Sequence, residues 1–116
     1  MRVLLVAASL WLLTLVVVGS VRAQEARSAT QTPKQAIRAV FGKYADQAIR
    51  VVSCETGGTF STTARNGQYL GLFQMGSWER RTYAHGRYTT PLDQSRAAWR
   101  YFAATGFDWS PWTCKP

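Results

Sequence analysis

The stretch RVVSCETGG, residues 50–58, decides which fold this chain can adopt, because it joins an apolar helical stripe to an acid and two glycines. Val51, Val52 and Glu55 share one face of a predicted helix over residues 44–55, since they recur at spacings of three and four. The glycine pair ends that helix directly after the acid. We therefore expect Glu55 at the rim of the core, where loops can form a cleft beside it.

Glu55 is also the acid for which the sequence offers no structural role. Burial disfavours the charged form of a carboxyl group, so an acid on an apolar rim can hold a proton near neutral pH. A protonated Glu beside a glycosidic oxygen is the general acid that glycoside cleavage needs. Residues 56–78 contain no Asp or Glu that would supply the second carboxylate of an ordinary glycosidase. The structural alternative is a surface residue at a helix end.

Local signals around this stretch predict a mainly α domain of the α+β type with one short β-hairpin. Thr-x-x-Gln and Thr-x-x-Asp spacings mark helix starts, and Asn-Gly is typical of a two-residue hairpin turn. The further predicted elements are a helix from TPKQ (residues 32–35) to Gly42, strands near residues 62–65 and 68–73 around Asn66-Gly67, a helix from Trp78 to about Ala84 capped by Ser77, and a helix that starts at Thr90 and ends at Gly106.

Cys54 and Cys114 are the two cysteines of the chain. In an oxidising compartment an even pair is most simply one disulfide. Closing a loop of about sixty residues would stabilise the fold by roughly 4 kcal/mol and tie the C-terminal tail beside Glu55. Two cysteines and one histidine, His85, are a poor basis for a metal site. We expect no metal and no other cofactor.

The N-terminal residues 1–23 have the pattern of a secretory signal peptide: a basic Arg2, an apolar run over residues 3–18, and a small residue, Ala23, at the cleavage position. The alternative is an uncleaved signal anchor, because the run falls just short of a membrane span of ~20 residues. Residues 24–31 are polar and form a predicted flexible lead, and residues 32–116 form the domain. We expect a secreted, wall-associated protein.

The formal net charge is +8, and loss of Arg2 and Arg22 with the signal peptide lowers it to +6. A small basic exported protein favours polyanions such as acidic wall polymers or membrane surfaces. Nucleic acid is disfavoured, because the arginines are scattered and export leads away from the cytoplasm. We expect a monomer.

Two longer motifs carry a resemblance to a known family. CETGG (residues 54–58) followed by YLGLFQMG (residues 69–76) resembles the E-S-G-G and G-L-M-Q motifs of soluble lytic transglycosylases, which have a lysozyme-like fold. AIRVVSCETGG (residues 48–58) with the closing WSPWTC (residues 109–114) is similar to resuscitation-promoting factors, which pair a cysteine before the catalytic Glu with one at the C-terminus. The resemblance covers roughly residues 44–114.

The resemblance implies an enzyme that cuts the β-1,4 link between N-acetylmuramic acid and N-acetylglucosamine in peptidoglycan. Glu55 matches the family's catalytic Glu, and Gln74 matches the motif Gln that lines the cleft opposite. Tyr69 and Phe73 lie in the segment that carries Gln74, Phe73 standing where the motif usually has Met. Thr56 stands where the transglycosylase motif has Ser. Such relatives also manage with one acid.

Flat aromatic surfaces beside polar groups suit pyranose rings, and they add Trp78 to the candidate substrate-binding residues. Trp109 and Trp112 are expected to pack over the disulfide, and contact with substrate is left open. The acid acts on a 6-hydroxyl in a transglycosylase and on water in a muramidase, and the sequence does not separate these. Two other classes stay open: a non-catalytic wall-binding or signalling protein on the same fold, and a small basic membrane-acting protein.

Overall fold

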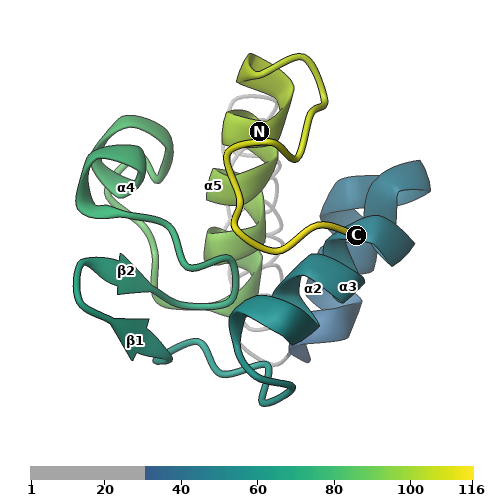
Figure 1. Ribbon diagram of the computed structural model, residues 1–116, viewed down its shortest axis with the longest axis horizontal. Helices are drawn as coiled ribbons and strands as arrows, with labels where there is room; N and C mark the ends of the chain where they lie inside the picture. Colours follow the sequence, from purple (N-terminus) through teal and green to yellow (C-terminus); the bar gives the residue numbers. More distant parts are fainter. Residues whose placement is uncertain (1–30) are drawn as a thin grey trace, which may run out of the picture. The chain divides into compact units, whose positions relative to one another are not determined.

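Residues 31–116 are described by a computed structural model, so the expected signal peptide and nearly all of the expected lead lie outside the described residues. They form one unit in which helices predominate, as predicted (Figure 1). Within this range no helix has the length and apolarity that crossing a bilayer needs. The elements are α2 (Pro33–Phe41), the 3-10 turn η1 (Gly42–Tyr44), α3 (Ala45–Glu55), β1 (Arg65–Asn66), β2 (Tyr69–Leu70), α4 (Ser77–Tyr83) and α5 (Pro91–Ala104).

The first helix begins and ends where local chemistry predicts. The Thr32 hydroxyl accepts a hydrogen bond from the Gln35 N–H, and the Gln35 side chain accepts one from the Thr32 N–H. This reciprocal capping box provides hydrogen bonds for backbone N–H groups at the helix start, and Pro33 in the first turn has no N–H that needs a partner. At the other end Gly42 takes a φ of 52°, which releases the chain into η1.

Helix α3 packs the predicted stripe into the core. Val51 and Val52 are fully buried, and Glu55 is the last residue of the helix and only partly buried. The chain turns away through Gly57 and Gly58, both of which have positive φ. The acid therefore lies at the rim of the core, as the sequence predicts.

The core is a stack of aromatic rings around α5. Helix α2 packs against both α3 and α5, and α4 packs against α5. Phe102 of α5 stacks on Trp109 with ring centroids 4.2 Å apart, and Phe41 of α2 stacks on Trp109 at 5.9 Å. Trp112 contacts Trp109 at 5.1 Å. Both tail tryptophans are thus core residues, which draws the tail after α5 back onto the helices.

The hairpin differs from the prediction in its register and its length. Asn66 pairs with Tyr69, so the two-residue loop is Gly67–Gln68 rather than Asn66–Gly67. Only the glycine of this loop takes a positive φ. Each strand is two residues long, because the chain turns again through Gly71 at a φ of 84°.

The start of α4 also corrects the sequence analysis. Gly76, not Ser77, is the N-cap, and it makes no side-chain cap. The Ser77 hydroxyl instead donates a hydrogen bond of 3.1 Å to the Gln68 side chain of the hairpin loop. A tertiary contact has replaced the local cap, which ties α4 to the hairpin.

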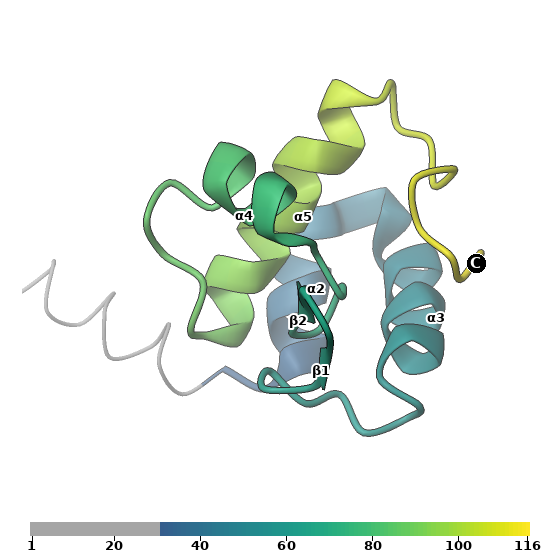
Figure 2. The same ribbon diagram turned by 60° about the vertical axis from the view of Figure 1, so that its left-hand side comes forward.

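The disulfide between Cys54 and Cys114 is present, with Cα atoms 5.9 Å apart and a sequence separation of 60. The tail leaves the end of α5 and crosses to the end of α3, as Figures 1 and 2 show from two directions. The bridge thus fastens the last residues of the chain beside Glu55.

Removing this bridge should lower the melting temperature strongly. Closing a loop of this length stabilises a fold by about 4 kcal/mol, and each kcal/mol shifts the melting temperature of such a domain by about 4–8 °C. We expect the double variant Cys54→Ala/Cys114→Ala to melt about 15–30 °C below the parent protein, as measured by circular dichroism. A reductant should lower the parent to the same value and leave the variant unaffected. An unaltered melt of the reduced parent would contradict the bridge.

Candidate functional site

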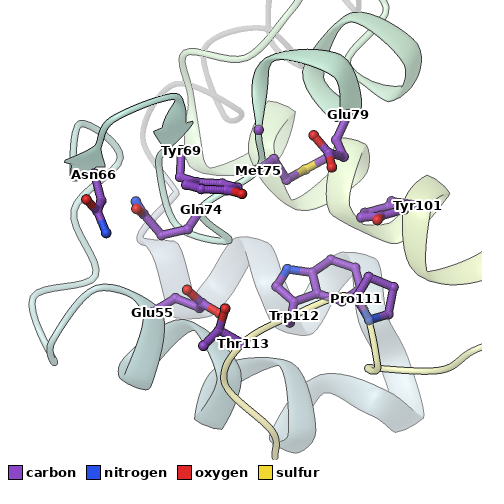
Figure 3. A pocket seen from close by; sticks show the side chains of 11 residues that line it. Glu55, Asn66, Tyr69, Gln74, Met75, Glu79, Tyr101, Pro111, Trp112 and Thr113 are labelled. Carbon is purple, nitrogen blue, oxygen red and sulfur yellow. The ribbon is translucent and has the colours of Figure 1, made fainter.

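A cleft of about 250 Å³ opens in front of Glu55 (Figure 3). The end of α3 forms its floor, the hairpin and the start of α4 form one wall, and Tyr101 with the tail forms the other. The lining residues are Glu55, Asn66, Tyr69, Gln74, Met75, Gly76, Glu79, Tyr101, Pro111, Trp112 and Thr113. Of the six predicted catalytic and substrate-binding residues, the cleft brings together Glu55, Tyr69 and Gln74.

Within residues 31–116, only one oxygen of the Glu55 carboxylate accepts a hydrogen bond. Its Oε1 accepts a hydrogen bond of 3.1 Å from the backbone N–H of Cys114. Cys114 is fixed in turn by its disulfide to Cys54, the residue that precedes the acid. The other oxygen has no hydrogen-bond partner among residues 31–116 and is left for a ligand in the cleft. The disulfide thus joins the residue before Glu55 to the residue that binds its carboxylate, and so positions the carboxylate.

Gln74 is fixed in the opposite wall by its own side chain. Its Nε2 donates hydrogen bonds of 2.9 Å to the backbone carbonyls of Ala64 and Gly71. Gln74 also has a φ of 45°, an uncommon value for a residue other than glycine. These bonds hold the amide against the hairpin, where Figure 3 shows it between Asn66 and Glu55. Tyr69, 44 % exposed, presents its ring to the same cleft.

Behind this wall lies a buried brace that the sequence analysis missed. The Gln94 side chain of α5 is 1 % exposed. Its Oε1 accepts from the Leu72 N–H at 2.8 Å, and its Nε2 donates to the carbonyls of Thr62 and Tyr88 at 2.9 and 3.1 Å. A Cβ at Gly71 would collide with this amide, so only glycine fits there. Gln94 therefore fixes the loop that carries Gln74.

Tyr88 adds a fourth hydrogen bond to the three that Gln94 makes. Its hydroxyl donates to the carbonyl of Leu70 at 2.8 Å. Burial raises the pKa of Tyr88 well above its ordinary value, so the hydroxyl keeps its proton and its role as donor. The hairpin wall is thus anchored to the segment that leads into α5 as well as to α5 itself.

The tail wall includes two aromatic residues: Tyr101, which the sequence analysis did not assign to a ligand site, and Trp112, whose contact with substrate it left open. Trp112 donates its indole N–H to the carbonyl of Phe73 at 3.0 Å and lies 5.0 Å from the Tyr101 ring, centroid to centroid. Burial and the neighbouring Glu79 and Tyr83 raise the pKa of Tyr101, which keeps its hydroxyl protonated. This wall therefore offers ring surface and a hydroxyl. The contacts join residues far apart in the sequence, so no local pattern reveals them.

Glu79 is a second carboxylate in the cleft lining, one residue beyond the range that the sequence analysis found free of acids. It lies in the first turn of α4, and its carboxylate folds back over Gly76. Figure 3 shows it at the far side of Met75 from Glu55. Its position beside Tyr101 makes it a lining residue of the distal part of the cleft.

Three of the predicted substrate residues lie outside the lining, each for a structural reason. Thr56 is 8 % exposed, and its hydroxyl bridges the carbonyl of Val52 and the N–H of Phe60. Phe73 is fully buried. Trp78 is 57 % exposed on α4 and contacts Tyr83 edge-on. The first two are buried inside the domain, and the third is exposed on α4 and is not part of the lining.

The charge of the cleft is opposite to that of the chain. No Lys or Arg lines it, although residues 31–116 contain eleven basic residues and only five acids. Two of those five acids, Glu55 and Glu79, lie in this cleft. Within the same range, no three His, Cys, Asp or Glu side chains gather closely enough to hold a metal ion. The lining suits a neutral polar ligand better than an anion.

Comparisons of the chain with models of protein families, with curated proteins and with solved structures found no significant match.

Replacing Gln94 tests whether the brace holds the wall. The change Gln94→Ala leaves one buried N–H and two carbonyls without partners, and each such group costs about 1–3 kcal/mol. We expect a loss of about 3 kcal/mol or more in the free energy of unfolding, measured with urea. The control Arg96→Ala, at an exposed position of the same helix, should change it by less than about 0.5 kcal/mol. Equal effects of the two variants would contradict the brace.

Proposed function

We propose that this protein cleaves the glycan strands of peptidoglycan at the β-1,4 link between N-acetylmuramic acid and N-acetylglucosamine, with Glu55 as the proton donor. The observation that carries the proposal is the placement of this one acid at the floor of a cleft, held through one oxygen by Cys114. The resemblance of CETGG and YLGLFQMG to the transglycosylase motifs supports the same substrate.

In the proposed cleavage, Glu55 first donates a proton and then takes one up. The protonated acid gives its proton to the glycosidic oxygen as the bond to the anomeric carbon of muramic acid breaks, which releases the sugar on that oxygen. The resulting carboxylate then takes a proton from the nucleophile that attacks the same carbon. With the muramoyl 6-hydroxyl as nucleophile the product is a 1,6-anhydro sugar, and with water it is a reducing end. Glu55 ends each route protonated, as it began.

The surroundings of the acid support a single-acid mechanism. No second Asp or Glu follows Glu55 until position 79, and the Glu79 carboxylate folds back over Gly76 at the start of α4. The substrate's own N-acetyl group is then the partner that stabilises the positive charge developing at the anomeric carbon. Glu79 has the separate role of a ligand-binding residue beyond Met75.

The cleft composition also favours a neutral sugar. Tyr69 and Tyr101 offer ring faces with a hydroxyl at the tip, and Asn66 and Gln74 offer amide groups beside them. Apolar surfaces with a few polar groups are the usual lining of small-molecule sites, and pyranose rings present the complementary surfaces. An anionic polymer backbone would meet two carboxylates and no basic side chain here.

Glu55→Gln tests the proton donor. The glutamine oxygen can still accept the Cys114 N–H, so the melting temperature should stay close to that of the parent. Release of muropeptides from purified sacculi should fall by about 10²–10⁴-fold, the usual contribution of a general acid. The control Asp46→Asn removes the same charge from an exposed position of α3 and should retain the parent rate.

Activity that survives in Glu55→Gln would contradict the assignment. Binding to sacculi by both the parent and the variant, with release by neither, would identify a non-catalytic wall-binding protein instead. Mass spectrometry of the parent's products separates the two routes, because anhydromuramoyl ends are lighter than hydrolysed ends by one water.

Glu79→Gln tests whether one acid is enough. Since the proton donor stays in place, we expect kcat on soluble glycan fragments to fall by less than about tenfold, with the larger effect on KM. A loss of kcat as large as that of Glu55→Gln would show instead that Glu79 takes part in the chemistry, and the single-acid mechanism would be wrong.

A further inference from the structure

A second cavity, of about 220 Å³, lies between the end of α4 and one face of α5. Its lining comes from the connection after α4 and from positions 93, 96 and 100 of α5, which recur at helical spacing and so share a face. The lining residues are Ala84, His85, Arg87, Asp93, Arg96 and Arg100. None of them lines the cleft in front of Glu55.

Three guanidinium groups converge on this cavity without a carboxylate partner. The one ion pair within residues 31–116 joins Arg38 and Asp46, on other elements. Asp93 is the only acid in the lining, and its carboxylate accepts the Thr90 N–H at 3.3 Å as part of the cap of α5. With His85 neutral, the formal charge of the lining is therefore +2.

One of the three guanidinium groups is held in place. Arg100 is partly buried, and its Nη1 donates to the carbonyl of Tyr83, the last residue of α4, at 2.8 Å. This bond fixes a guanidinium group of the cavity lining and leaves its other donors free for a ligand. Arg87 and Arg96 are exposed at the rim. Like charges gathered in a concave site repel one another, and a bound anion relieves that repulsion.

The donor set selects the shape of the anion. Each guanidinium is a planar fork that can donate two parallel hydrogen bonds to a phosphate or a carboxylate. A carboxylate is planar, and its two oxygens, with about four lone-pair sites, accept chiefly from donors near that plane. A phosphate group is tetrahedral and offers its oxygens in several directions, so it can accept from three forks and an imidazole at once.

We propose that this cavity is a phosphate-binding site. The proposal stands on the arginine cluster alone and does not rest on the proposed peptidoglycan cleavage. Phosphate-bearing wall polymers and membrane phospholipids carry this group as a phosphodiester, whose two unesterified oxygens lie on a tetrahedral centre, so either source can present it to the site. A phosphate bound here would balance part of the excess positive charge of the chain.

Isothermal titration calorimetry of the purified protein with glycerol 3-phosphate at low ionic strength tests the proposal. Arg96→Gln should weaken binding by about tenfold or more, because it removes a charge-assisted fork. Arg87→Gln is a second variant at the rim and should act in the same direction. The matched control Arg50→Gln removes an equal charge from an exposed position of α3 and should change the affinity by less than about twofold.

Several outcomes would overturn the site. Equal weakening by Arg96→Gln and Arg50→Gln would mean that only net charge attracts the ligand. Binding of acetate as strong as that of glycerol 3-phosphate would contradict selection of phosphate, and no measurable heat with the parent protein would exclude the site. Poly(glycerol phosphate) and vesicles of phosphatidylglycerol, matched in phosphate, then separate the sources: the one whose binding depends on Arg96 is the partner.

Discussion

The hydrogen bond from the Cys114 N–H to the Glu55 carboxylate is the contact on which the cleft depends. Cys114 lies two residues before the end of the 86 residues that the structure describes, and its disulfide to Cys54 keeps this hydrogen bond in place. Without the disulfide the Cys114 N–H would have no fixed position at the end of α3, whereas Trp112 keeps its own hydrogen bond to the carbonyl of Phe73. One covalent link therefore stabilises the fold and positions the acid at the same time.

Features that depend on neighbouring residues, and the disulfide that follows from the presence of two cysteines, could be predicted from the sequence. The capping box at Thr32, the stripe of α3 that ends in Glu55 and the pairing of the two cysteines are all found. Local reasoning was wrong where a distant residue competes for the same group. Ser77 has the chemistry of an N-cap, but its hydroxyl binds the Gln68 side chain, so α4 begins after Gly76 without a side-chain cap.

Apart from the disulfide, features that depend on contacts across the sequence could not be predicted. Gln94 looks like any polar residue of an amphipathic helix, yet it is buried and bonds to a backbone N–H 22 residues away. Glu79 looks like an ordinary acid at a helix start, and only the packing of α4 against α5 brings it into the cleft beside Tyr101. The predicted Trp78 is not among the lining residues of the cleft and contacts Tyr83 of the same helix.

The distribution of charge fits the proposed action of this basic chain on a neutral substrate. Its acids are few, yet two of the five within residues 31–116 line the cleft, while three arginines gather in a separate cavity on α5. An anion attracted by the net charge would be repelled from the cleft and drawn to the arginines. The two sites can then be occupied together without competition. If both proposals hold, a protein bound to an anionic surface through these arginines would keep a separate cleft for the proposed glycan.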